Sequence, residues 1–205
     1  MTHENYLETK KLKKGLITLK SPLLDLQNWF MEEYGVKPLN LIYEFLDHNQ
    51  KPRLTLVWDS EDDRLKFNPD WREFKNKEKI IVEKFKELAK PFENYSAERM
   101  FLITGGFRGL AIAEANQKVT EEEIEKLIKD LSEFEIWKIM KRESTARFFF
   151  FTEEQAEKYK QEEYIKYLSN RYFELVNQYD EFGYSTTSGM KISVDSKYNI
   201  EKIYK

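Results

Sequence analysis

The densest group of side chains that could do chemistry is an acidic run, Asp59, Glu61, Asp62 and Asp63. Carboxylates serve as general bases and as ligands for hard cations, but either role needs several groups to converge on one point. These four lie in one short loop after an expected strand, with no histidine nearby, and such runs are usually solvated. We therefore expect no catalytic or metal-binding role for them, although their negative charge suits contact with a basic partner.

Other reactive residue types are scarce. The 205 residues include no Cys and only two His, His3 and His48, which excludes disulfides, thiolate chemistry and three-histidine metal sites. There is no GxSxG nucleophile elbow and no GxxxxGK[ST] phosphate loop. We expect His48 to lie in a hydrophilic surface turn and His3 in the N-terminal tail. The sequence therefore predicts no catalytic residue, no metal and no cofactor.

A glycine-rich stretch, TGGFRG at 104–109, contains the GxxG pattern of a nucleic-acid-binding KH loop. A KH loop joins two helices, whereas both flanks here alternate as strands do, so we expect the glycines to supply the positive φ of a tight hairpin. The next expected strand carries Leu110, Ile112 and Ala115 where an RNA-recognition domain carries stacking aromatics. With 34 basic and 37 acidic residues, a net charge of -3, we expect no nucleic-acid partner.

Two groups of aromatic residues also suggest a ligand site. Phe148 to Phe151 are four consecutive rings, which we interpret first as a strand buried on both faces, because an exposed strand of this kind would aggregate. The alternative is an aromatic platform for a base or ligand. The tyrosines between Tyr159 and Tyr184 follow an expected helix, so we expect buried rings whose hydroxyls reach water or a partner.

The elements expected to position these residues form two series. After a flexible basic segment at 1–14, the first series is strand 15–19, helix 21–34, a hairpin of strands 39–45 and 54–58, helix 68–91 and strand 100–104. The second series is strand 109–115, helix 120–131, a hairpin of strands 136–140 and 148–151, one long helix after 152, and a C-terminal hairpin of strands 190–194 and 198–203.

The order β-α-β-β-α-β is typical of the ferredoxin-like fold. The sequence therefore predicts an α+β chain of two tandem ferredoxin-like halves, 15–106 and 107–205, with antiparallel sheets and helices packed on one face. The order of strands within each sheet stays open. We expect two separate cores, one with Leu26, Phe30, Phe74 and Phe85, and one with Ile124, Leu127, Leu131 and Leu168.

No residue signature names an activity. The polar N-terminus and the lack of a long apolar run lead us to expect a cytoplasmic protein without a membrane partner. Our leading hypothesis is a non-enzymatic protein-interaction module of the inhibitor, antitoxin or immunity type, with Asp59, Glu61, Asp62, Asp63 and Trp71 as the contact surface. The alternative interpretation of Trp71 is that its ring packs inward beside Phe74. The alternatives are a small-molecule sensor and a carboxylate-dependent enzyme.

Overall fold

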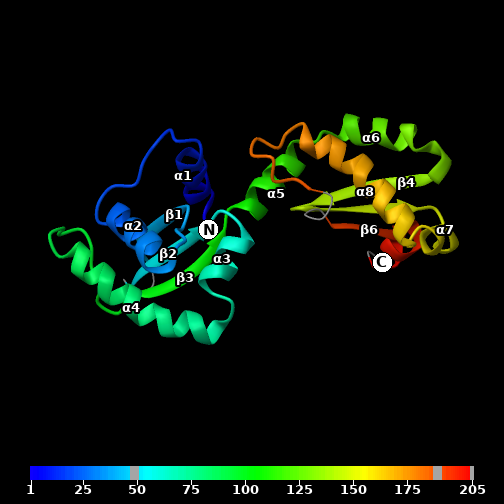
Figure 1. Cartoon of the computed structure of the whole chain (residues 1–205). Coiled ribbons are helices and arrows are strands. Elements are labelled where there is room, and N and C mark those ends of the chain that lie inside the picture. Colours follow the sequence, from blue (N-terminus) through cyan, green and yellow to red (C-terminus); the bar gives the residue numbers. More distant parts are fainter. Residues whose placement is uncertain (47–50, 187–190, 204–205) are drawn as a thin grey trace. The chain divides into compact units, whose positions relative to one another are not determined.

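The computed structural model describes residues 1–46, 51–186 and 191–203, apart from the side chains of Trp71 and Ile203. These residues form a mixed α and β structure with two three-stranded sheets. The chain divides into two compact units, residues 1–108 and 109–205, and each contains one sheet (Figure 1). Within the described part of the chain, no helix is both long enough and apolar enough to cross a membrane.

The sheet of the first unit has the strand order β1-β2-β3. Its strands are β1 (Asn40–Phe45), β2 (Pro52–Trp58) and β3 (Phe101–Gly106), and the helices are α1 (His3–Lys13), α2 (Leu23–Tyr34), α3 (Glu61–Phe67) and α4 (Trp71–Ala89). β1 and β2 form the antiparallel pair that the sequence predicts. The chain then crosses over through α3 and α4, so β3 runs parallel to β2. The sheet is therefore mixed.

The core of the first unit lies between one face of this sheet and helices α2 and α4. Alternate residues of β2 point to that face, and the period of α4 presents Phe74 and Phe85 to it. Leu26 and Phe30 of α2 complete the contact, and all four side chains are at most 1 % exposed. The predicted membership of the first core is confirmed.

The N-terminal segment differs from the prediction. Residues 1–14, expected to be flexible, form α1, which begins at the N-cap Thr2 and packs on the second face of the sheet. There the buried Asn40 Nδ2 donates to the buried Thr9 Oγ1 at 2.9 Å. The expected strand 15–19 is wrong, because Gly15 leaves α1 with φ +68° and Leu16, which is 69 % exposed, pairs with none of the described strands. Apolar alternation makes a strand only where another strand is available for pairing.

The sheet of the second unit has the order β4-β5-β6. Its strands are β4 (Ile136–Arg142), β5 (Thr145–Phe150) and β6 (Lys191–Ser196). Its helices are α5 (Arg108–Lys118), α6 (Glu121–Asp130), α7 (Glu153–Lys158), α8 (Glu162–Asn177) and α9 (Lys197–Ile203), with a 3₁₀ turn at Ser132–Phe134. Arg108, the first residue of α5, is also the last residue of the first unit. β4 and β5 form the second predicted hairpin, and β6 runs parallel to β5. Figure 1 shows α6 and α8 on the same side of this sheet.

The core of the second unit is a separate cluster between that side of the sheet and the helices. Ile124, Leu127, Leu131 and Leu168 all belong to it, which confirms the predicted membership of the second core. Within the aromatic run, Phe148 to Phe150 are at most 3 % exposed, so β5 is buried on both faces at this end only, whereas Arg147 and Phe151 are exposed.

A buried polar network fixes α5 against this core. Asn116 Nδ2 donates to the carbonyl oxygens of Glu143 and Thr145 at 2.6 and 3.2 Å, while Asn116 Oδ1 accepts from the Tyr172 hydroxyl at 2.8 Å. Both side chains are at most 1 % exposed. Because each polar atom named here has a partner, burial of the amide and the hydroxyl is tolerated. The expectation of buried tyrosine rings holds for Tyr172.

Three further elements differ from the prediction. Residues 109–115 lie in α5, where Ala111, Ile112 and Ala115 are buried at helical spacing and Ala is the strongest helix former. The expected long helix is broken into α7 and α8 at 159–161, and the expected last strand, 198–203, lies in α9. Each described sheet therefore has three strands and one parallel pair, not the four-stranded antiparallel arrangement of the ferredoxin-like prediction.

Candidate functional site

The acidic run does not form a loop. Asp59 follows β2, and its Oδ2 pairs with Lys13 Nζ of α1 at 2.6 Å. Ser60 is the N-cap of α3, so Glu61, Asp62 and Asp63 occupy the first turn of that helix. Carboxylates at this position interact favourably with the helix dipole, and this explains the sequence locally without any catalytic role.

The carboxylates of α3 are directed to local partners. Ser60 Oγ accepts from the Asp63 amide at 3.1 Å and donates to Asp63 Oδ2 at 2.8 Å. Arg64 Nε donates to Glu61 Oε2 at 2.8 Å, and this hydrogen bond lowers the pKa of Glu61. Glu61 and Asp62 are exposed, as is Leu65 on the next turn. Glu61, Asp62 and Asp63 therefore form a short helical surface, whereas Asp59 precedes the helix and pairs with Lys13.

Trp71 is the first residue of α4 and follows the N-cap Asp70. Its side chain lies outside the described part of the structure, so both interpretations of Trp71 stay predictions. His48 also lies outside it, while His3 opens α1. Among the described residues, no group of three or more His, Cys, Asp or Glu side chains is arranged to hold a metal ion.

The TGGFRG stretch joins β3 to α5, so the hairpin predicted for it is wrong. Gly105 and Gly106 are the last residues of β3, and neither has a positive φ. Among the described glycines, a positive φ is found at Gly15, Gly35 and Gly183. Phe107 is fully buried, and its ring stacks on Tyr6 of α1 with centroids 5.5 Å apart. The stretch ends a strand, buries a ring and begins a helix.

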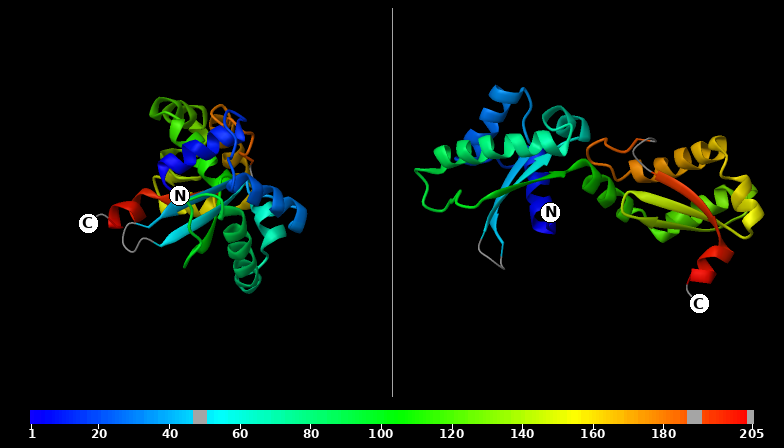
Figure 2. Two further views of the ribbon diagram at one scale, coloured as in Figure 1. Left: turned by 90° about the vertical axis from the view of Figure 1, so that its left-hand side faces the viewer. Right: turned by 90° about the horizontal axis from the view of Figure 1, so that it is seen from below.

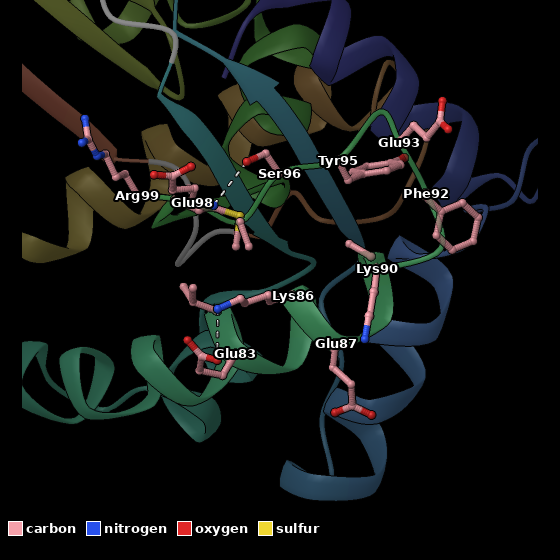
Figure 3. Close-up of a pocket in the computed structure, with 14 residues that line it drawn as sticks. Glu83, Lys86, Glu87, Lys90, Phe92, Glu93, Tyr95, Ser96, Glu98 and Arg99 are labelled. Carbon is pink, nitrogen blue, oxygen red and sulfur yellow. Dashed lines mark hydrogen bonds and ion pairs between the residues drawn. The ribbon is translucent and has the colours of Figure 1, made fainter.

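One hollow of the first unit was not anticipated from the sequence. It has a volume of about 1230 Å³ and lies between the last turns of α4 and the segment 91–100 that leads to β3. Figure 3 shows side chains from both segments around it. Its apolar surface comes from the buried Ala89 and Met100 and the partly buried Val82 and Phe92. We call this feature the α4 groove.

Exposed charges of both signs surround the apolar surface of the α4 groove. They include Glu83, Lys86, Glu87, Lys90, Glu98 and Arg99. Glu83 and Lys86 approach to 3.9 Å with side chains 73 % and 67 % exposed, so water screens their attraction.

The far wall of the groove is held in place by Tyr43 of β1. Its hydroxyl donates to the carbonyl oxygen of Ser96 at 2.9 Å and accepts from the amide of Ser96 at 2.8 Å. The centroids of the Tyr43 and Tyr95 rings are 4.9 Å apart. Burial raises the pKa of the Tyr43 hydroxyl. The segment 91–100, which forms one wall of the groove, is therefore anchored to the sheet through Ser96.

A scan against protein-family models finds no family that matches the chain. A search of curated proteins also finds no match.

Proposed function

We propose that the chain is a cytoplasmic, non-enzymatic protein-interaction module of the inhibitor, antitoxin or immunity type. The observation that carries this proposal is the α4 groove, in which an apolar surface is surrounded by exposed charges of both signs. Protein interfaces have this composition, with an apolar centre that excludes water and a polar rim.

The size and lining of the groove favour a protein segment over a small molecule. Small-molecule sites usually enclose about 300–1,000 Å³ and bury most of the ligand among apolar walls with a few polar groups. The α4 groove is larger, at about 1230 Å³, and long flexible charged side chains make up much of its rim. A small-molecule sensor remains the alternative, and tight binding of a metabolite in this groove would favour it. The hypothesis of a carboxylate-dependent enzyme has less support, because the carboxylates of Asp63 and Glu61 bind Ser60 and Arg64 of the same segment.

The acidic turn of α3 is a second part of the proposed contact surface. Glu61, Asp62 and the exposed Leu65 combine negative charge with an apolar side chain, which suits a basic partner. Asp59, Asp63 and Trp71 lie nearby in sequence and complete the predicted surface. From Trp71 to the groove residue Val82, helix α4 rises about 16 Å, so the two parts lie toward opposite ends of one helix.

We also propose that the two units are separate domains that arose by duplication. Both have a β-hairpin followed by two helices and a third strand parallel to the second, and both have two helices before the hairpin. This shared order supports the duplication, although the element order differs from the one that the sequence predicts.

The proposed function is tested by affinity capture from the native cytoplasm with wild-type protein and two variants. Phe92→Asp places a charge in the apolar part of the groove, and Phe45→Asp makes the same change at an exposed ring of β1. We expect a stoichiometric protein partner that wild type and Phe45→Asp retain and Phe92→Asp loses, with all three equally stable to heat. Equal retention by both variants would contradict the role of the groove.

A further inference from the structure

The second sheet has a face that the core does not use. In β5, Ala146, Phe148 and Phe150 belong to the core, so Arg147 and Phe149 point to the opposite face. Thr145 shares that face, since it lies two residues before Arg147. The register places Lys138 of β4 and Asp195 of β6 beside Phe149, Met140 and Ser193 beside Arg147, and Arg142 and Lys191 beside Thr145. We call this surface the open face; Figure 2 shows the second unit from two further directions.

The open face is strongly basic in a chain whose net charge is -3. Lys138, Arg142 and Lys191 are exposed, and the side chain of Arg147 is 53 % exposed. The one carboxylate among the open-face positions is Asp195, whose Oδ2 lies 3.7 Å from Arg147 Nη1. Four positive side chains therefore stand against one negative one, and this excess attracts anions.

The centre of the open face is apolar and hollow. Phe149, Met140 and Ile200 of α9 line a cavity of about 240 Å³ together with Arg142, Arg147 and Asp195. Arg147 is held in position there, since its Nε donates to Ser193 Oγ at 3.1 Å. Met140 is 37 % exposed, so an apolar side chain of a partner can contact it without any rearrangement of the sheet. An apolar centre with a basic rim is suited to a partner that is both acidic and apolar.

We propose that the open face binds an acidic, extended segment of a partner protein. Same-face side chains recur about every 6.6 Å along a strand and about 4.8 Å across strands, so carboxylates on alternate residues of an extended segment match the basic positions. Guanidinium groups such as those of Arg142 and Arg147 bind carboxylates in bidentate geometry.

A single-stranded nucleic acid suits the open face less well. Such binding depends on exposed rings on which bases stack. Phe149 is only 3 % exposed, and Lys197 Nζ lies 5.1 Å from the centroid of the Trp137 ring at the same end of the sheet. The basic charge is therefore present without the stacking surface.

The test uses the full-length protein and three labelled probes of equal length: an oligoglutamate peptide with interspersed leucines, an oligolysine peptide with the same leucines, and a single-stranded oligodeoxynucleotide. We expect the acidic peptide alone to bind, more weakly as salt rises. Arg142→Glu/Lys191→Glu should weaken this binding by about tenfold or more, and the milder Arg142→Gln/Lys191→Gln by less. Both variants should keep the circular dichroism spectrum of the wild type.

The matched control is Lys126→Glu/Lys129→Glu, which makes the same change of net charge at exposed residues of α6. It should bind the acidic peptide almost as the wild type does. Equal losses in the control and the open-face variants would overturn the proposal, as would tighter binding of the oligonucleotide than of the peptide. A dimer that the open-face variants dissociate would also overturn it, because the occupant would then be a second copy. The α4 groove lies in the other unit, so its variants test the proposed function independently.

Discussion

At the scale of single residues, Tyr172 links the chemistry of a side chain most directly to stability. Its ring is buried and its hydroxyl donates to Asn116 Oδ1. Burial, with a smaller contribution from the charge of Glu121, raises the pKa of Tyr172 well above the ordinary value for tyrosine. The native protein therefore holds this proton at a pH where the unfolded chain has lost it.

This difference predicts the alkaline stability of the protein. An unfolded tyrosine ionises near pH 10, so above about pH 10 the unfolded state binds fewer protons than the native state, and stability falls as pH rises. Below about pH 10, Tyr172 is protonated in both states, so its contribution to stability is fully present. Tyr172→Phe should lose about 1–2 kcal/mol at neutral pH, because Asn116 Oδ1 is left without this donor, yet its stability should decline less steeply above pH 10. Urea unfolding at a series of pH values measures both effects, and parallel declines would contradict the assignment.

The acidic turn of α3 gives a second prediction at this scale. Glu61→Lys/Asp62→Lys should slow association with a basic partner and reduce its salt dependence, because exposed charges act mainly on the encounter rate. Asp63 is left unchanged since Ser60 binds it. Stopped-flow association with the captured partner measures the effect.

The matched control for that experiment is Glu162→Lys/Glu163→Lys, which reverses two acidic residues in the first turn of α8. Each double variant should lose about 0.3–1 kcal/mol per charge through the helix dipole, and the α3 variant also loses the hydrogen bond from Arg64 to Glu61. Only the α3 variant should associate more slowly. Unchanged association would remove the acidic turn from the contact surface.

At the scale of elements, helix α6 depends on its first residues. Thr120 Oγ1 accepts from the Glu123 amide at 3.2 Å, and Glu123 Oε2 accepts from the Thr120 amide at 2.7 Å. Thr120→Ala should lower the free energy of unfolding by about 1 kcal/mol, whereas Thr120→Ser keeps the hydroxyl and most of the stability. Guanidinium unfolding should show a lower midpoint with an unchanged slope for Thr120→Ala, and equal midpoints for both variants would contradict the capping role.

The same capping box shows why some elements are predictable from sequence. Thr120-Glu123 and Thr152-Gln155 each satisfy helix-end amides within four residues, and both are present as predicted. The two β-hairpins are also local, and both form. The strands predicted at 15–19 and 109–115 are absent there, because short apolar alternation does not distinguish a strand from coil or from an Ala-rich helix. The spacing of Ala111, Ala115 and Val119 was the available signal for α5.

The candidate surfaces were less predictable than the elements for a related reason. The acidic run could be found because its residues are adjacent in sequence, but its pairing with Lys13 depends on α1 lying against the sheet. The α4 groove depends on how Tyr43 holds the segment around Ser96, a contact between residues far apart in sequence. The open face depends on the register of three strands, including the parallel pairing of β6. Single-sequence patterns contain little information about contacts of this range.

At the scale of the whole molecule, the two hydrophobic clusters share no residue. Chains of roughly a hundred residues can bury enough surface to fold alone, and the two units, 1–108 and 109–205, are both near that size. We therefore expect each unit to unfold as its own cooperative transition.

Two core substitutions test this independence. Leu54→Ala removes a fully buried side chain from the first cluster, and Leu168→Ala does the same in the second. Each should cost about 2–5 kcal/mol, because the vacated space is only partly refilled. Calorimetry of the full chain should show that each substitution lowers the transition of its own unit, and fragments 1–108 and 109–205 should reproduce the two transitions separately. If both substitutions shift one common transition, or if a fragment fails to fold, the units depend on each other for stability. The proposal of two domains would then be wrong even though their cores are distinct.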